Sequence, residues 1–160
     1  MWITPSGIPR YSITIADLVK VNVRTGREVG KRRPSIEKGM HRAVYMSCPK
    51  IRAIVHTHSP YTIAVSISSE FRQVIEEARI VAGTPSVISN KPSGSEELAR
   101  AVATEFSGGA RAVVVRNHGV VAAGMTIHHA RAVAESLEEW SKILAISMSL
   151  GGAKYFLGEP

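Results

Sequence analysis

The sequence predicts a protein of the α/β class, because stretches with helical periodicity alternate with short apolar stretches typical of strands. Residues 51–58, "IRAIVHTH", have the length and apolar character of a buried strand. Residues 126–150 repeat apolar side chains at the spacing of an amphipathic helix. The apolar stripe of that helix consists of Val133, Leu137, Trp140 and Leu144. Periodicity alone does not give the order of the strands.

The chain before residue 51 is expected to form short strands within residues 1–30, with turns at 5–9 and 25–26, and then a helix at 34–48. Pro49 follows this helix and closes it. Ser35 is the expected N-cap, which would put Glu37 in the first helical turn.

The chain after residue 58 is expected to form a largely helical stretch at 60–83, a short strand at 86–88, a helix at 93–106, and a buried strand at 110–124 interrupted by a turn at 117–119. Ser93 or Ser95 is expected to cap the helix at 93–106, and two glutamates in its first turn favour the same start. No repeat or linker interrupts this alternation, so we expect one domain over residues 1–160.

Composition indicates a globular protein of the reducing cytoplasm. The chain has 160 residues, and 44% of them are hydrophobic. Cys48 is the only cysteine, so no internal disulfide is expected. No apolar run reaches the length of about 18 residues that a membrane span needs, and the N-terminus lacks the order of a signal peptide. We therefore expect no membrane partner.

The net charge of +7 favours an anionic partner. The basic side chains are dispersed, apart from a small cluster at Lys31, Arg32 and Arg33, and only 6% of the residues are aromatic. Base stacking needs more aromatic side chains than this, so we expect no nucleic-acid partner. A small phosphorylated anion accounts for the same charge.

Four side chains could form a metal site. His56 and His58 would share one face of their strand, about 7 Å apart along it. His118 ends a second apolar strand, and Glu37 begins a helix. Three imidazoles and a carboxylate are a plausible ligand set for zinc. If substrate displaced the carboxylate, Glu37 could act as a base beside the metal.

Other interpretations of these residues remain open at this point. A His-x-His pair also occurs as hydrogen-bonded surface residues, and Glu37 could simply favour a helix N-terminus. His41 lies four residues after Glu37 on the same helix face and could pair with it as a ligand. His128 and His129 are expected to be neutral and exposed in the first turn of the last helix. Spacing does not choose between these sets.

Five ordered motifs give the sequence a resemblance to the class II aldolase family, the group of fuculose-phosphate aldolase and ribulose-phosphate 4-epimerase. They are "ITPSGIP" at 3–9, "RPSIEKGMHRAVY" at 33–45, "AIVHTHSPYTIAVS" at 53–66, "SGSEELA" at 93–99 and "VVVRNHGVVAAG" at 113–124. The resemblance implies a three-layer α/β/α sandwich around a mainly antiparallel sheet. It also implies a homo-oligomer, usually a tetramer with active sites between neighbouring subunits.

The resemblance implies one Zn²⁺ per chain, with His56, His58 and His118 as ligands. Glu37 falls on the acidic residue that serves as the catalytic base and can also ligate the metal. His41 matches a motif position without a ligand role. The positions that help to bind the substrate phosphate are Ser6, Gly7 and Ser35.

The implied activity is that of a lyase of carbohydrate metabolism, which cleaves a ketose 1-phosphate such as fuculose 1-phosphate into dihydroxyacetone phosphate and an aldehyde. Glu37 stands where the 4-epimerases are expected to carry aspartate, which favours an aldolase or a related dehydratase over an epimerase. Methylthioribulose-phosphate dehydratase and ribulose-phosphate 4-epimerase are the alternative enzymes. A non-catalytic, metal-stabilised oligomer is the alternative outside the enzymes.

Three features depart from the family pattern. Relatives carry an N-terminal helix and a "GN-x-S" phosphate motif before the "ITPSG" turn, whereas this sequence starts at that turn. Ile36 occupies a position where a second serine usually binds phosphate. The tyrosine that protonates the leaving aldehyde aligns near Glu77, and Tyr61 and Tyr155 are the candidates to replace it.

Overall fold

The computed structural model describes residues 1–158. These residues form two compact units. The first consists of Met1–Pro49 and Lys91–Thr104, and the second of Lys50–Asn90 and residues 105–158. Helix α4 (Glu96–Ser107) carries the chain from the first unit into the second.

The first unit contains a small antiparallel sheet of order β1-β2-β3, as the short strands predicted for residues 1–30 suggest. The strands are β1 (Trp2–Ile3), β2 (Val19–Val21) and β3 (Glu28–Val29). Two 3₁₀ turns, η1 (Arg10–Ser12) and η2 (Ile15–Asp17), were not predicted. A capping box explains η2, because the carboxylate of Asp17 accepts hydrogen bonds from the amide and hydroxyl of Thr14.

Helix α1 (Lys38–Ser47) begins later than the sequence predicts. Glu37 is its N-cap, so the assignment of Ser35 as N-cap and of Glu37 to the first turn was wrong. The reason is a turn before the helix: Ser35 O accepts from Lys38 N at 3.1 Å, and Ser35 Oγ accepts from Glu37 N at 3.2 Å. The helix ends before Pro49, as expected.

The second unit is built on a mixed, mainly antiparallel sheet of order β4-β7-β6-β5. Its strands are β4 (Ala53–Thr57), β5 (Ser86–Ile88), β6 (Ala112–Val115) and β7 (Gly119–Gly124). The pairs β4–β7 and β6–β7 are antiparallel, and β5–β6 is parallel. The interleaved helices and strands confirm the α/β class.

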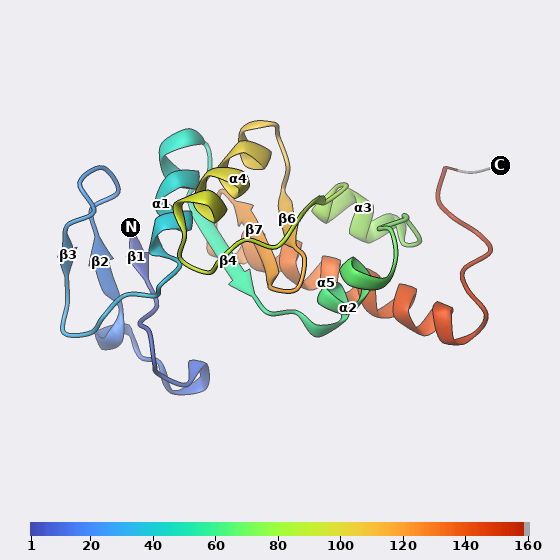
Figure 1. Cartoon of the computed structure of the whole chain (residues 1–160), viewed down its shortest axis with the longest axis horizontal. Helices are drawn as coiled ribbons and strands as arrows, with labels where there is room; N and C mark the ends of the chain where they lie inside the picture. Colours follow the sequence, from blue (N-terminus) through green and yellow to red (C-terminus); the bar gives the residue numbers. More distant parts are fainter. Residues whose placement is uncertain (159–160) are drawn as a thin grey trace. The chain divides into compact units, whose positions relative to one another are not determined.

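Three helices pack within this unit: α2 (Pro60–Ser68), α3 (Glu76–Ala82) and α5 (Ile127–Ser149). The largely helical stretch predicted at 60–83 is thus two short helices with a non-helical link at 69–75. Helix α5 contacts β4, β7 and both shorter helices, and runs along the sheet (Figure 1). At the start of α4, Ser95 Oγ accepts from Leu98 N at 3.0 Å, which makes Ser95 the cap rather than Ser93.

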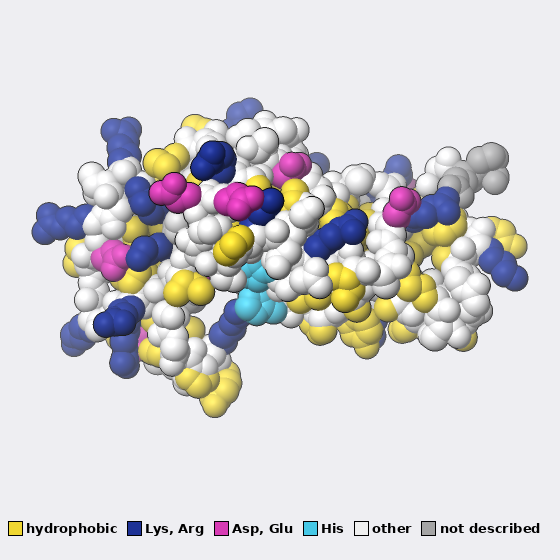
Figure 2. Space-filling model, viewed as in Figure 1, with side chains coloured by type: hydrophobic (Ala, Val, Ile, Leu, Met, Phe, Trp, Pro, Cys, Tyr) yellow, Lys and Arg dark blue, Asp and Glu magenta, His cyan; other side chains and the backbone are white. Residues whose placement is uncertain are grey.

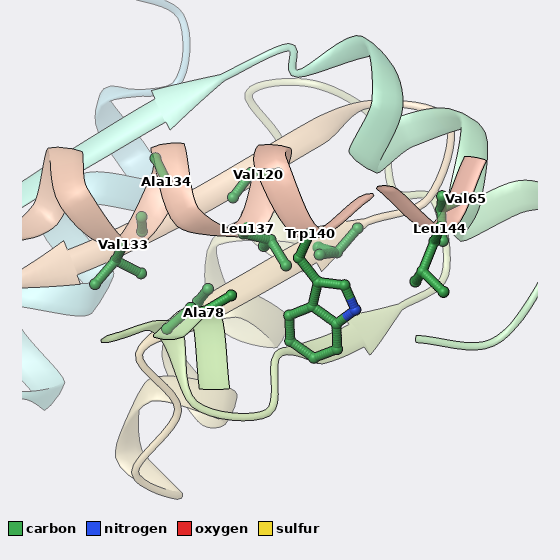
Figure 3. Close-up of a cluster of buried hydrophobic side chains, with 12 residues drawn as sticks. Val65, Ala78, Val120, Val133, Ala134, Leu137, Trp140 and Leu144 are labelled. Carbon is green, nitrogen blue, oxygen red and sulfur yellow. The ribbon is translucent and has the colours of Figure 1, made fainter. Parts of the chain in front are cut away.

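The core of the second unit is organised around α5 (Figure 3). The predicted stripe is confirmed: Val133, Leu137, Trp140 and Leu144 are all buried. Trp140 also donates its indole N–H to Arg72 O at 2.9 Å, so that its one polar atom is satisfied. Within the described part of the chain, no helix is long and apolar enough to cross a membrane.

Candidate metal centre

Three histidines of the second unit converge, as the sequence predicts. The ring centroids of His56, His58 and His118 lie 5.1–5.4 Å apart. One ligand nitrogen from each ring lies within 4.8 Å of the other two. Figure 2 shows histidine side chains gathered in a patch on the visible face of the molecule.

The β4–β7 ladder positions His56. Its backbone pairs with Val121, and its Nδ1 lies 2.9 Å from Val120 O. A carbonyl oxygen can only accept, so Nδ1 carries the proton and donates it. In the neutral ring the lone pair then sits on Nε2, the nitrogen that a metal would bind.

His58 comes one residue after β4, and its side chain is exposed. Gly119 makes room for it: a Cβ at position 119 would lie 3.1 Å from Cδ2 of His58 and would collide with Thr57 O. Only glycine allows the two segments to approach this closely.

The tight turn between β6 and β7 positions His118. Asn117 adopts a left-handed conformation, with φ of 59°, which asparagine tolerates better than most residues. The amide of His118 donates to Val115 O at 3.1 Å and closes the turn. The turn predicted at 117–119 therefore places the third imidazole, that of His118, in the histidine group.

The donor set suits a transition metal. Three imidazoles are borderline nitrogen donors, and three histidines with an open position are a known catalytic zinc set. Among the described residues, these three form the one group of at least three histidine, cysteine or carboxylate side chains with converging ligand atoms.

Glu37 belongs to the first unit, where it is 5% exposed. Its Oε1 accepts from the backbone amide of Gly94 at 3.2 Å. Gly94 has φ of +72°, and a Cβ there would lie 3.2 Å from Ile36 O. No role was predicted for Gly94, although it lies in the motif at 93–99. Its place between two serines just before a predicted helix is typical of a turn.

The predicted phosphate residues lie on two adjacent segments of the first unit. Ser6 N donates to Arg33 O at 2.9 Å, and Ser35 N donates to Thr4 O at 3.0 Å. Gly7 follows with φ of +75°, and nothing lies within 4 Å of where its Cβ would be. Ser6 and Gly7 are exposed.

The remaining candidates lie outside the histidine group. Burial lowers the pKa of His41 from 6.5 to about 4, so this ring is neutral at pH 7. His128 and His129 are exposed in the first turn of α5, as expected. Tyr61 and Tyr155 are exposed too.

Comparison with known proteins identifies the family to which the chain belongs. The family model described as class II aldolase and adducin N-terminal domain matches residues 1–145. The chain belongs to this family. The resemblance found in the five sequence motifs is confirmed.

Two relatives are similar to this class II aldolase over most of its chain. A fuculose phosphate aldolase of Methanococcus maripaludis is 31% identical over 151 residues, which cover 94% of this chain and 81% of the relative. A 5-deoxy-D-ribulose 1-phosphate aldolase of Bacillus thuringiensis is 35% identical over 154 residues, covering 95% and 71%. These relatives identify the protein as an enzyme of the lyase class.

Solved structures share the fold. An L-fuculose 1-phosphate aldolase superposes with a TM-score of 0.87 at 29% identity, over 99% of this chain and 74% of that one. The corresponding enzyme of Thermus thermophilus superposes with a TM-score of 0.83 at 29% identity, over 96% and 80%.

Proposed function

We propose that this class II aldolase cleaves a ketose 1-phosphate into dihydroxyacetone phosphate and an aldehyde, with one Zn²⁺ per chain held by His56, His58 and His118. The convergence of the three imidazoles carries the proposal. The substrate class is supported by the relatives, which are named for fuculose phosphate and 5-deoxyribulose 1-phosphate.

When bound at this histidine group, the metal would supply a Lewis acid that stabilises negative charge developing on the substrate. The orientation of the ligands is the contribution of the protein. The hydrogen bond from His56 to Val120 O fixes one tautomer, and the turn at Asn117 fixes the direction from which His118 enters.

We assign proton transfer to Glu37. Cleavage breaks the C3–C4 bond of the ketose: the C4 hydroxyl loses its proton to solvent and becomes the aldehyde carbonyl, while C3 keeps the electron pair and takes up one proton, so that the reaction is neutral in protons. Glu37 delivers a proton to C3 in this direction and removes it in the reverse direction. Its burial and its hydrogen bond to the amide of Gly94 support this role, because both restrict the carboxylate to one position.

The proposed phosphate residues are Ser6, Gly7 and Ser35. The surplus of basic over acidic side chains lies almost entirely in the first unit, which also contains these three residues. Such a surplus attracts a phosphorylated substrate. The proposed assembly is a homotetramer. The proposed location is the cytoplasm, because the chain has a single cysteine.

Assays of the purified full chain with added Zn²⁺ test the proposal. Fuculose 1-phosphate and 5-deoxyribulose 1-phosphate should yield dihydroxyacetone phosphate, and a chelator should abolish the reaction. Loss of water from methylthioribulose phosphate would show that the protein is a dehydratase instead. Epimerisation of ribulose 5-phosphate without cleavage would show that it is a 4-epimerase. Light scattering tests the tetramer.

A further inference from the structure

The start of helix α2 is capped from a distant helix. The first amides of any α-helix have no partner within the helix. The N-cap residue Ser59 makes no side-chain cap here. Its hydroxyl instead lies 2.7 Å from the hydroxyl of Thr57. The amides of α2 therefore need another acceptor.

Glu138 of α5 is that acceptor. Its Oε1 accepts from Tyr61 N at 3.0 Å, and its Oε2 accepts from Thr62 N at 2.9 Å and from Thr62 Oγ1 at 2.7 Å. Thr62 is fully buried. A carboxylate at the N-terminus of a helix is favoured by charge as well as by hydrogen bonding, so this is a strong tie between α2 and α5.

This tie lies close in sequence to His58, which is outside the β4–β7 ladder. The β4–β7 ladder reaches Thr57 and stops there, so His56 is within the ladder and His58 is beyond it. Helix α2 begins two residues after His58, at Pro60. The backbone of His58 is therefore fixed on one side by the sheet and on the other by the start of α2.

We infer that Glu138 is a positioning residue for the metal ligand His58, acting through the N-terminus of α2. The inference rests on the proposed metal binding by the three histidines. Glu138 touches neither substrate nor metal in this role. It holds the amides of Tyr61 and Thr62, and these hold the chain where it leaves His58.

The test compares metal affinity in Glu138→Gln and in the parent full chain, with Co²⁺ alone as the probe. Glutamine has the same length but replaces one acceptor oxygen with an NH₂ donor, so one of the ties must break. The Kd for Co²⁺ should rise about 10-fold, as is typical for supports of metal ligands. The visible spectrum of bound Co²⁺ should shift, and amide exchange at Tyr61 and Thr62 should accelerate.

Two controls separate positioning from general stability. Thr126→Val removes a similar cap, the hydrogen bond from His129 N to Thr126 Oγ1 at the start of α5. It should lower Tm but leave the Co²⁺ affinity and spectrum unchanged. Glu139→Gln changes an exposed residue next to Glu138 on the same helix and should leave the Co²⁺ affinity and spectrum unchanged.

If Glu138→Gln does not fold, Thr62→Val serves instead, because it deletes only the hydroxyl tie and should weaken Co²⁺ binding by a smaller factor. Suppose that the parent binds Co²⁺ and that the folded Glu138→Gln variant has the same Co²⁺ affinity and spectrum. This result would overturn the role proposed for Glu138 but not the metal site. A parent that binds no Co²⁺ would overturn the metal site and this role together.

Discussion

Gly119 lies directly against His58, since a Cβ at position 119 would come within 3.1 Å of the imidazole Cδ2. Gly119→Ala should therefore displace the ligand or the adjoining backbone of Thr57. Overpacking of this kind costs typically about 1–3 kcal/mol of folding free energy. Metal affinity should fall in the same variant, which chemical unfolding and Co²⁺ titration would measure together.

Gly39→Ala is the matched control for that change. Gly39 lies within α1, and nothing is found within 4 Å of where its Cβ would be. Replacing a helical glycine by alanine should stabilise the fold by roughly 0.5–1 kcal/mol. Its metal affinity should equal that of the parent. If Gly119→Ala lost neither stability nor metal affinity relative to the parent, as expected of Gly39→Ala, then the close approach of Gly119 to His58 would not be needed for metal binding.

Metal content should depend on three histidines and not on the others. Alanine at His56, His58 or His118 removes one of the three proposed nitrogen ligands and should release most bound zinc. His128→Ala and His129→Ala alter exposed residues of α5 and should keep one zinc per chain. Elemental analysis of the purified variants gives the ratio, and full zinc in His58→Ala would exclude this ligand set.

The features predicted best from the sequence are those that depend on local residue patterns. The stripe of α5 follows helical spacing and is buried as expected. The histidine pair of β4 and the turn before β7 were also visible, because a strand alternates its faces and Asn-His-Gly predicts a turn. Together these patterns located the candidate metal site.

What the sequence did not predict depends on contacts between distant segments. Nothing near Thr62 indicates that its amide is capped by Glu138, 76 residues later. The misplaced start of α1 is an exception, because its cause is local: Ser35 has the properties of an N-cap, but its hydroxyl and carbonyl close a separate turn before the helix. Propensity does not distinguish these two uses of a serine.

Trp140 should contribute to stability through its hydrogen bond as well as its volume. Trp140→Phe removes the indole N–H that donates to Arg72 O at 2.9 Å in the buried core. Loss of a hydrogen bond of this kind costs about 0.5–1.5 kcal/mol, and the cavity left by the smaller ring adds to that cost. Trp2→Phe is the control, because Trp2 is 65% exposed and its replacement should change stability by less than about 0.5 kcal/mol. Urea unfolding of both variants would show whether the difference between them is as large as expected.

Glu37→Gln separates a base from a metal ligand. Glutamine keeps one acceptor oxygen for the amide of Gly94, so the variant should fold, but it cannot accept a proton at neutral pH. With His56, His58 and His118 unchanged, zinc occupancy should fall little. Turnover should drop by about 10²–10⁴, the usual contribution of a positioned proton donor or acceptor. Glu96→Gln, an exposed change in the same unit, should turn over like the parent.

Solvent exchange provides the decisive measurement on Glu37→Gln. The parent should exchange a carbon-bound proton of dihydroxyacetone phosphate with deuterium without any aldehyde, because this half-reaction needs only the base and the metal. In Glu37→Gln, exchange should collapse by the same factor as turnover while zinc stays bound. Exchange at the parent rate would show that another group moves the proton. Loss of zinc together with exchange would instead show that the carboxylate is needed as a ligand, since the metal would then leave with it.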